Sequence, residues 1–203
     1  MEDYEKHIEQ CLQYGFYSAA INSHIVPFYA KRLEGSGVLV GSSIGFPLGQ
    51  ASIAAKLEEA KVAIEQGADE LDYVLNISCL LDGNRTYIKD EMSYLVDLSR
   101  SKNVVLKVII ENCYLEEKHK IMACEIAMET GIDYLKTSTG FGTGGATVED
   151  IKLMRGVVGD KVKLKAAGGI RNLEAASAMI ELGVERIGSA YSAAIIDDFV
   201  ASN

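Results

Sequence analysis

Tryptophan, long apolar runs and clustered metal ligands are missing from this chain of 203 residues, which has only three histidines and four cysteines. No apolar run is long enough to cross a membrane, and residues 1–6 are charged and show no signal-peptide pattern. The cysteines include no C-x-x-C pair, so we expect reduced thiols rather than a disulfide framework or a zinc site. The histidines have no second ligand at helical or hairpin spacing, so we expect no metal site. These absences favour a cytoplasmic enzyme without a membrane partner.

Positive charge is also scarce, because 20 lysines and arginines face 29 acidic residues and leave a net charge of −9. This balance argues against a nucleic-acid partner and favours solubility. Any anion site must therefore be local, built from backbone amides and a few basic side chains. The chain is 48% hydrophobic and 24% charged, which is ordinary for a globular protein. No composition shift marks a linker, so we expect residues 1–203 to form a single domain.

Hydrophobic periodicity and glycine stops divide the chain into alternating helices and strands. We expect helices at 3–14, 25–33, 52–66, 85–100, 115–129, 148–157, 173–182 and 191–200, and strands at 18–22, 38–44, 71–76, 104–110, 132–137, 161–166 and 185–189. In the third helix, the apolar stripe includes Leu57 and Ala60, and Lys56 is expected among the polar residues around it. The fourth strand is almost continuously apolar, as in a strand that is covered on both faces.

Strict alternation of helix and strand predicts a parallel sheet with helical crossovers. A faint internal repeat supports this, since residues 67–72, 131–136 and 183–188 each show a helix stop followed by a strand, in the same register. Such a repeat is typical of a (β/α) barrel, in which the active site lies at the C-terminal ends of the strands. We therefore predict an α/β fold of the TIM-barrel type with seven strands, one fewer than the usual eight.

Two lysines lie at the ends of consecutive predicted strands, Lys136 in the fifth and Lys165 in the sixth. If these strands are paired neighbours, the two ammonium groups repel each other, which disfavours protonation of one amine and leaves it nucleophilic. The small residues at 137–140 leave room for a substrate beside Lys136. The alternative is that both lysines are solvated residues at strand ends.

Asp72 is the candidate partner for this lysine pair. Strand alternation places Asp72, Val74 and Asn76 on one face, so Asp72 faces the barrel interior if Val74 does. A buried carboxylate needs a partner, and a network of Asp72 with the lysines could relay protons. The alternative is an ion pair that only holds the barrel together.

Glycine-rich turns follow the last two predicted strands. Gly168 and Gly169 lead to Asn172, a suitable N-cap for the next helix, and Arg171 adds a positive charge nearby. In barrels, the turns after the last two strands often bind phosphate through backbone amides at a helix N-terminus. The alternative is that these glycines only permit tight turns.

Six short motifs occur in a fixed order along the chain. They lie at residues 45–49, 67–72, 106–111, 136–141, 145–147 and 165–171. Together they resemble the deoxyribose-phosphate aldolases, and the resemblance covers the chain from about residue 16 to its end. It implies a TIM barrel and a class I aldolase, a lyase that reversibly cleaves 2-deoxyribose 5-phosphate to glyceraldehyde 3-phosphate and acetaldehyde without a cofactor.

The resemblance also implies roles for individual residues. In the family, the lysine that matches Lys136 forms the Schiff base, the lysine that matches Lys165 perturbs it, and the aspartate that matches Asp72 takes part in proton transfer. The positions that match substrate and phosphate contacts are Asn22, Thr139, Gly140, Gly168, Gly169 and Ser189. The implied partners are small aldehydes and sugar phosphates, and we expect a homodimer.

Three departures from the family pattern leave alternatives open. The family's first strand, with its Asp-His-Thr-Leu-like segment, has no counterpart, so we expect a barrel that lacks this strand. Ala20 stands where the family often has cysteine, and Ala190 and Tyr191 replace small hydroxyl residues of the phosphate turn. One alternative is a Schiff-base aldolase for a different or unphosphorylated sugar. The other is a non-catalytic barrel that has lost its first strand.

Overall fold

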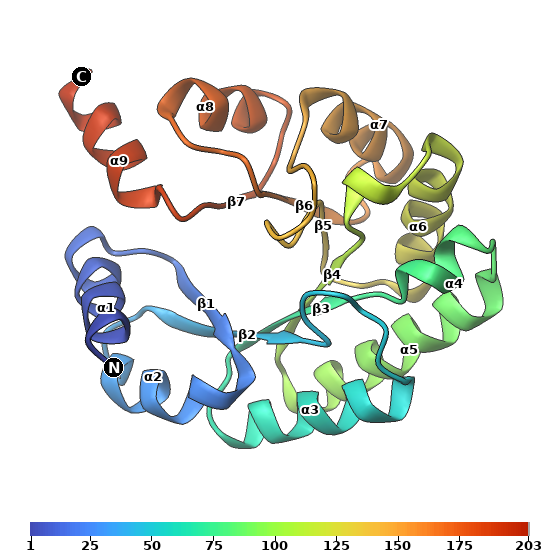
Figure 1. The fold of residues 1–203 in the computed structure, drawn as a ribbon, viewed down its shortest axis with the longest axis horizontal. Helices are drawn as coiled ribbons and strands as arrows, with labels where there is room; N and C mark the ends of the chain where they lie inside the picture. The colour runs from blue at the N-terminus through green and yellow to red at the C-terminus, as the bar shows by residue number, and fades with distance from the viewer. Residues whose placement is uncertain (203) are drawn as a thin grey trace.

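Seven parallel strands form one sheet whose spatial order follows the sequence in the computed structural model, which describes residues 1–202 (Figure 1). The strands are β1 (Ser18–Asn22), β2 (Leu39–Ile44), β3 (Glu70–Val74), β4 (Val105–Ile109), β5 (Tyr134–Lys136), β6 (Lys163–Ala167) and β7 (Arg186–Gly188). Each pairs in parallel with the next one along the chain. The predicted alternation and the count of seven strands are confirmed.

Helices cover the outside of the curled sheet (Figure 1). They are α1 (Glu2–Tyr14), α2 (Val26–Leu33), α3 (Ile53–Glu65), α4 (Ile77–Leu81), α5 (Arg85–Lys102), α6 (Glu117–Thr130), α7 (Val148–Val158), α8 (Leu173–Glu181) and α9 (Ser192–Ala201). Two short 3-10 helices, Ser23–Ile25 and Asn112–Tyr114, follow β1 and β4. These two and α4 were not predicted, because a single turn is too short to show a periodic apolar stripe. Within residues 1–202, no helix is long and apolar enough to cross a membrane.

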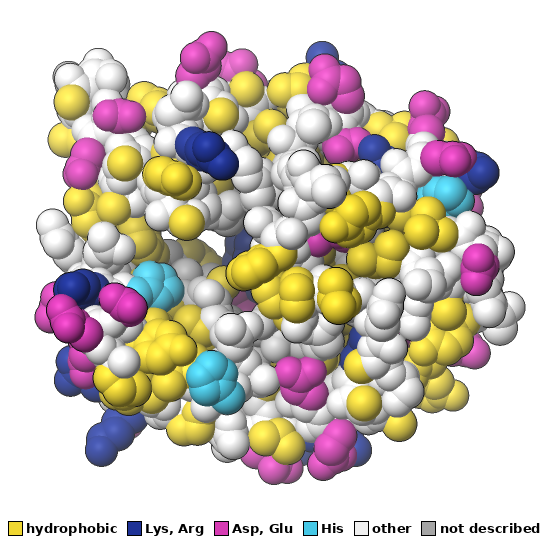
Figure 2. Space-filling model, in the orientation of Figure 1, with side chains coloured by type: hydrophobic (Ala, Val, Ile, Leu, Met, Phe, Trp, Pro, Cys, Tyr) yellow, Lys and Arg dark blue, Asp and Glu magenta, His cyan; other side chains and the backbone are white. Residues whose placement is uncertain are grey.

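The sheet is open between its first and last strands. Among the described residues β1 and β7 are not paired, and we call the space between them the seam. On the outside of the seam, α1 and α9 lie side by side, and the Tyr14 hydroxyl donates to Asp197 at 3.0 Å. Figure 2 shows an opening through the surface at this place. The barrel therefore has a gap at the position where an eighth strand would close the sheet.

The core lies between the sheet and the helices. On α5, one face is buried and includes Ile88, Met92, Leu95 and Val96. Strand β3 is buried along its whole length, as the strand of a covered parallel sheet should be. The helices thus bury one face each, β3 is enclosed on both sides, and the edge strands β1 and β7 are only partly buried.

Lys56 on α3 corrects one prediction, because it is fully buried instead of lying on the polar side of its helix. Its Nζ donates to Glu91 Oε1 at 2.6 Å and to the Val74 carbonyl at 2.7 Å. The other oxygen of Glu91 accepts the amide of Asn76 at 2.9 Å. Burial lowers the pKa of Lys56 and raises the pKa of Glu91. This pair ties α3 and α5 to the C-terminal end of β3, the strand that carries Asp72.

We predict that Lys56→Met destabilises the protein by about 3–5 kcal/mol, because it leaves the Glu91 carboxylate buried without its counter-ion. Urea unfolding followed by circular dichroism measures this loss. The double variant Lys56→Met/Glu91→Leu should recover most of it, because neither charge then remains.

Lys61→Met is the matched control for this prediction. Lys61 lies on the same helix and pairs with Glu58 at 3.5 Å, but both side chains are at least half exposed. Such pairs contribute roughly 0–1 kcal/mol, so this variant should remain near wild type. Equal losses for the two single variants would contradict a special role of the buried pair.

Candidate active site

One carboxylate, Asp72 on β3, holds three lysines inside the barrel. Its Oδ2 accepts hydrogen bonds from Lys136 Nζ at 2.7 Å and from Lys165 Nζ at 2.8 Å. Its Oδ1 lies 2.9 Å from Lys107 Nζ. Lys136 and Lys165 are register partners on the neighbouring strands β5 and β6, as the sequence predicted. All four side chains are buried, so the charges interact strongly.

Lys107 is a residue of this cluster that the sequence-based reasoning missed. It lies on β4, opposite Asp72 in the register of the sheet, and it is fully buried. Its Nζ also lies 2.9 Å from Glu70 Oε2, and Glu70 in turn binds Arg186. The signal that could have revealed it is a lone charge within an otherwise apolar predicted strand, because such a charge needs a buried partner.

The cluster shifts the proton affinities of its members. The pKa of Lys165 is lowered to about 8, chiefly by burial; Asp72 opposes this shift, and the charges of Lys136 and Lys107 add to it. For Asp72, burial favours the neutral acid, but the three ammonium groups outweigh it and hold the pKa well below its usual range. Asp72 is therefore a carboxylate at neutral pH, and a fraction of the Lys165 amine is neutral.

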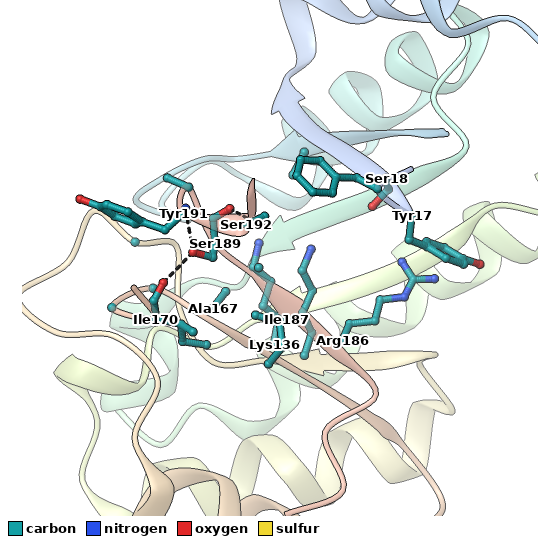
Figure 3. A pocket seen from close by; sticks show the side chains of 18 of the residues that line it. Tyr17, Ser18, Lys136, Ala167, Ile170, Arg186, Ile187, Ser189, Tyr191 and Ser192 are labelled. Atoms are coloured by element: carbon teal, nitrogen blue, oxygen red, sulfur yellow. Dashed lines mark hydrogen bonds between the residues drawn. The ribbon is translucent and has the colours of Figure 1, made fainter. Parts of the chain in front are cut away.

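A cavity of about 890 Å³ opens above the lysine cluster and reaches the seam (Figure 3). Lys136 points into it, and Tyr17 and Ser18 line it on the β1 side. Of the predicted site residues, the structure brings these together around the cavity: Lys136, Lys165, Thr139, Gly140, Gly168, Gly169 and Ser189. Asp72 lies behind the lysines.

Asn22 lies apart from the other predicted substrate contacts. It lines a smaller hollow of about 380 Å³ together with Ser43, Phe46 and Glu59. Phe141 lines both spaces, and its ring packs edge-on against Phe46 with centroids 5.4 Å apart. Asn22 does not line the cavity of the lysines, so direct contact of Asn22 with a substrate remains a prediction.

The glycine turns after β5 and β6 approach each other closely. Gly140, Gly168 and Gly169 all have positive φ angles, of 90°, 80° and 77°. A Cβ on Gly145 would lie 2.1 Å from the Gly168 carbonyl oxygen, so a side chain has no room there. The glycines therefore allow the backbone to form a concave turn at the end of the cavity.

Ser189 and Thr139, both predicted to contact the substrate, are held by their own chain. The Ser189 hydroxyl donates to the Ile170 carbonyl at 2.6 Å and accepts the Tyr191 amide at 2.9 Å (Figure 3). The Thr139 hydroxyl donates to Glu111, whose Oε2 also accepts the Thr139 amide at 3.2 Å. Glu111 is buried with a φ of 55°, which is strained for a non-glycine residue. Both hydroxyls therefore shape their turns.

An open (β/α) barrel with a cavity at the C-terminal strand ends is typical of enzymes, and paired amines that face such a cavity are chemically suited to react with carbonyl groups. The comparisons with known proteins agree with this class. Residues 1–192 match the model of the DeoC/LacD family of aldolases, and the chain belongs to this family.

Curated relatives and solved structures carry the same assignment. The chain is 50% identical to a deoxyribose-phosphate aldolase of Thermococcus gammatolerans, over 97% of this chain and 88% of the relative. It is 48% identical to that of Caldicellulosiruptor saccharolyticus, over 97% and 90%. The solved structure of "QR15, an Aldolase" aligns with a TM-score of 0.92 at 35% identity, covering 98% of this chain and 89% of that one. The aldolase of Aeropyrum pernix, described as tetrameric, aligns at 0.91 and 30% identity, over 100% and 85%.

We predict that the Lys165 amine titrates with a pKa of about 8. Asp72→Asn should lower this value further, because it removes the negative charge that stabilises the ammonium form. NMR of protein that carries isotope-labelled lysine measures the titration, and Lys165→Met assigns the signal. A Lys165 signal that titrates near the ordinary lysine value of about 10.4 would contradict the prediction.

Proposed function

We propose that the protein is a class I aldolase that reversibly cleaves 2-deoxy-D-ribose 5-phosphate to D-glyceraldehyde 3-phosphate and acetaldehyde. The observation that carries the proposal is the bridge at Asp72 Oδ2, which binds the amines of Lys136 and Lys165 at 2.7 and 2.8 Å beside an open cavity. The names of the curated relatives supply the substrate.

The first step needs one neutral amine. Lys136 points into the cavity, so its neutral form is placed to attack the C1 aldehyde of the open-chain sugar. Addition followed by loss of water gives an imine between Lys136 Nζ and C1. Because Lys165 binds the same carboxylate oxygen and has a pKa of about 8, its neutral form can accept the proton that Lys136 loses.

Carbon–carbon cleavage then uses the protonated imine as an electron sink. A base removes the proton from the C3 hydroxyl, the C2–C3 bond breaks, and its electron pair moves into an enamine on Lys136. The C3 fragment leaves as glyceraldehyde 3-phosphate. Protonation of C2 and hydrolysis of the imine release acetaldehyde and restore the amine. Asp72 with Lys165 is the group placed to take up and return these protons.

The phosphate end of the substrate is assigned to the glycine turns. Gly140, Gly168 and Gly169 form the concave end of the cavity, and the Arg171 side chain lines it as well. Backbone amides in such turns at a helix N-terminus bind phosphate groups in barrels. Because the chain as a whole is acidic, this local arrangement must supply the attraction for the anion.

We predict that borohydride reduction in the presence of the sugar phosphate or acetaldehyde forms a stable adduct on Lys136. Mass spectrometry of the digested protein locates the adduct, because reduction converts the imine to a secondary amine. Lys136→Ala should lose both the adduct and the retro-aldol activity.

Lys152→Met is the matched control, because Lys152 is an exposed lysine on α7 that does not line the cavity. This variant should be labelled like wild type. Full activity of Lys136→Ala would refute the assignment, and turnover by the wild-type protein would eliminate the non-catalytic alternative.

A second candidate function is an aldolase for an unphosphorylated sugar. It is favoured by Tyr191, whose ring lies 5.9 Å from the Arg171 guanidinium where the family pattern has a small hydroxyl residue. The ring covers part of the positive charge that an anion would use. Comparison of the phosphorylated and unphosphorylated sugars decides between the two candidates, because equal efficiency would favour the second.

For the leading candidate, we predict that Arg171→Met lowers kcat/KM for the phosphorylated sugar by about 10- to 100-fold. The loss corresponds to one charge-assisted hydrogen bond of about 1.5–3 kcal/mol. Activity on unphosphorylated 2-deoxyribose should stay unchanged, and Arg171→Lys should retain part of the phosphate preference. A parallel loss on both sugars would show that Arg171 does not act on the phosphate.

We also propose that the enzyme is cytoplasmic, forms a single domain and assembles as a homodimer. Support for an assembly comes from the Aeropyrum pernix relative, which is described as a tetramer. Sedimentation equilibrium of the purified protein measures the number of copies directly.

A further inference from the structure

A chain of buried charges continues behind Asp72 toward the seam. Lys107 Nζ lies 2.9 Å from both Asp72 Oδ1 and Glu70 Oε2. Glu70 accepts two hydrogen bonds from Arg186 Nη1, at 2.6 and 2.8 Å. Glu70 and Lys107 are fully buried, and the Arg186 side chain is only 13% exposed. The order of contacts is therefore Arg186, Glu70, Lys107 and Asp72, and Asp72 holds the two amines of the site.

Two aromatic rings hold the outer end of this chain. The Arg186 guanidinium lies 4.1 Å from the Tyr17 ring centroid and 4.8 Å from that of Tyr134. Tyr17 directly precedes β1 and Arg186 begins β7, so their contact crosses the seam, as Figure 3 shows. The two cation–π contacts leave the guanidinium little freedom, and its Nη1 is held against both oxygens of Glu70.

We propose that Glu70 and Arg186 are positioning residues, which share Lys107 with Asp72 and so set how strongly the Asp72 carboxylate holds the proton of Lys165. They act through Lys107 and do not touch the substrate. The inference rests on the proposed aldolase function, because it concerns the amine that must be neutral for the first step.

The charged surroundings of the Lys165 amine decide the sign of each effect. The titratable and charged groups that face it or line its cavity are Asp72 and Glu70 of β3, Lys107 of β4, Lys136 and Tyr134 of β5, Arg171 after β6, Glu185 before β7, Arg186 of β7, Tyr191 before α9, Tyr17 before β1 and His7 of α1. Glu185 is engaged by Arg155, and His7 has its pKa lowered by burial. Within this set, the contact that Glu70 and Arg186 can change is that of the Lys107 ammonium, which is divided between the carboxylates of Asp72 and Glu70.

Removal of Arg186 changes this division in favour of Glu70. Without the guanidinium, Glu70 has Lys107 as its remaining partner and draws it away from Asp72. Asp72 is then neutralised less and stabilises the ammonium form of Lys165 more. Removal of the Glu70 charge has the opposite result. Lys107 then pairs with Asp72 alone and neutralises it more, so Asp72 stabilises the ammonium form of Lys165 less. The two substitutions should therefore move the proton affinity of the Lys165 amine in opposite directions.

The test is the pH dependence of kcat/KM with 2-deoxyribose 5-phosphate for three variants. Activity rises with pH as the amine loses its proton, so the ascending limb reports the amine. We expect Arg186→Met to move this limb to higher pH and Glu70→Gln to move it to lower pH, each by roughly half a unit or more. The double variant Glu70→Gln/Arg186→Met should keep the lower-pH limb of Glu70→Gln, because without the Glu70 charge Arg186 has no carboxylate through which to change the division of Lys107.

Arg85→Met serves as the control, because Arg85 also binds two carboxylates, Glu125 and Glu129, but on the outer surface of α5 and α6. Its pH profile should match wild type. Folding of each variant is checked by circular dichroism, and the double variant restores charge balance where a single one is too unstable. The inference is overturned if the ascending limb of the kcat/KM profile stays at the same pH in both Glu70→Gln and Arg186→Met. It is also overturned if the limb moves in the same direction in both. Absence of turnover by the wild-type protein instead overturns the proposed function.

Discussion

The site depends on one interaction, the contact of the Asp72 carboxylate with three buried ammonium groups. Lys107, Lys136 and Lys165 lie within 2.7–2.9 Å of its two oxygens. Without the carboxylate, the lysines would repel one another in a medium that screens charge poorly. With it, they are held together but remain in excess over the negative charge, so one amine is easily deprotonated. The same contact therefore supports the fold and prepares the chemistry.

The parallel sheet is what makes this contact possible. Its register places Lys107 opposite Asp72 and Lys165 opposite Lys136, and the curl of the sheet brings β3 across to β5 and β6. The sheet keeps this curl although β1 and β7 are not paired. Side-chain contacts, instead of hydrogen bonds between strands, connect the two sides of the seam. Tyr17 against Arg186 on the inside and Tyr14 with Asp197 on the outside make these contacts. The cavity reaches the seam, so the seam and the site share one space.

Patterns in the sequence were reliable where neighbours along the chain decide the structure. Alternating periodicity predicted the order of the strands, and the position of Lys136 and Lys165 at consecutive strand ends predicted their pairing. The same reasoning placed Lys56 on a polar face, because hydrophobic periodicity counts every lysine as polar. It carries no information on the buried Glu91, which pairs with Lys56 in the core. Thr139, which the family resemblance placed at the substrate, donates its hydroxyl to Glu111, a partner that the sequence did not indicate; its contact with a substrate stays a prediction.

By itself, the sequence determined the fold class, the order of the elements and the membership in an aldolase family, because these follow from periodicity and from motifs within short segments. It also indicated the lysine pair. The tertiary structure alone decided that Lys107, Glu70 and Arg186 join Asp72, that Asn22 lies in a separate hollow, and that the cavity extends to the seam. These facts concern residues far apart in the chain, and strand register and sheet curvature bring such residues together.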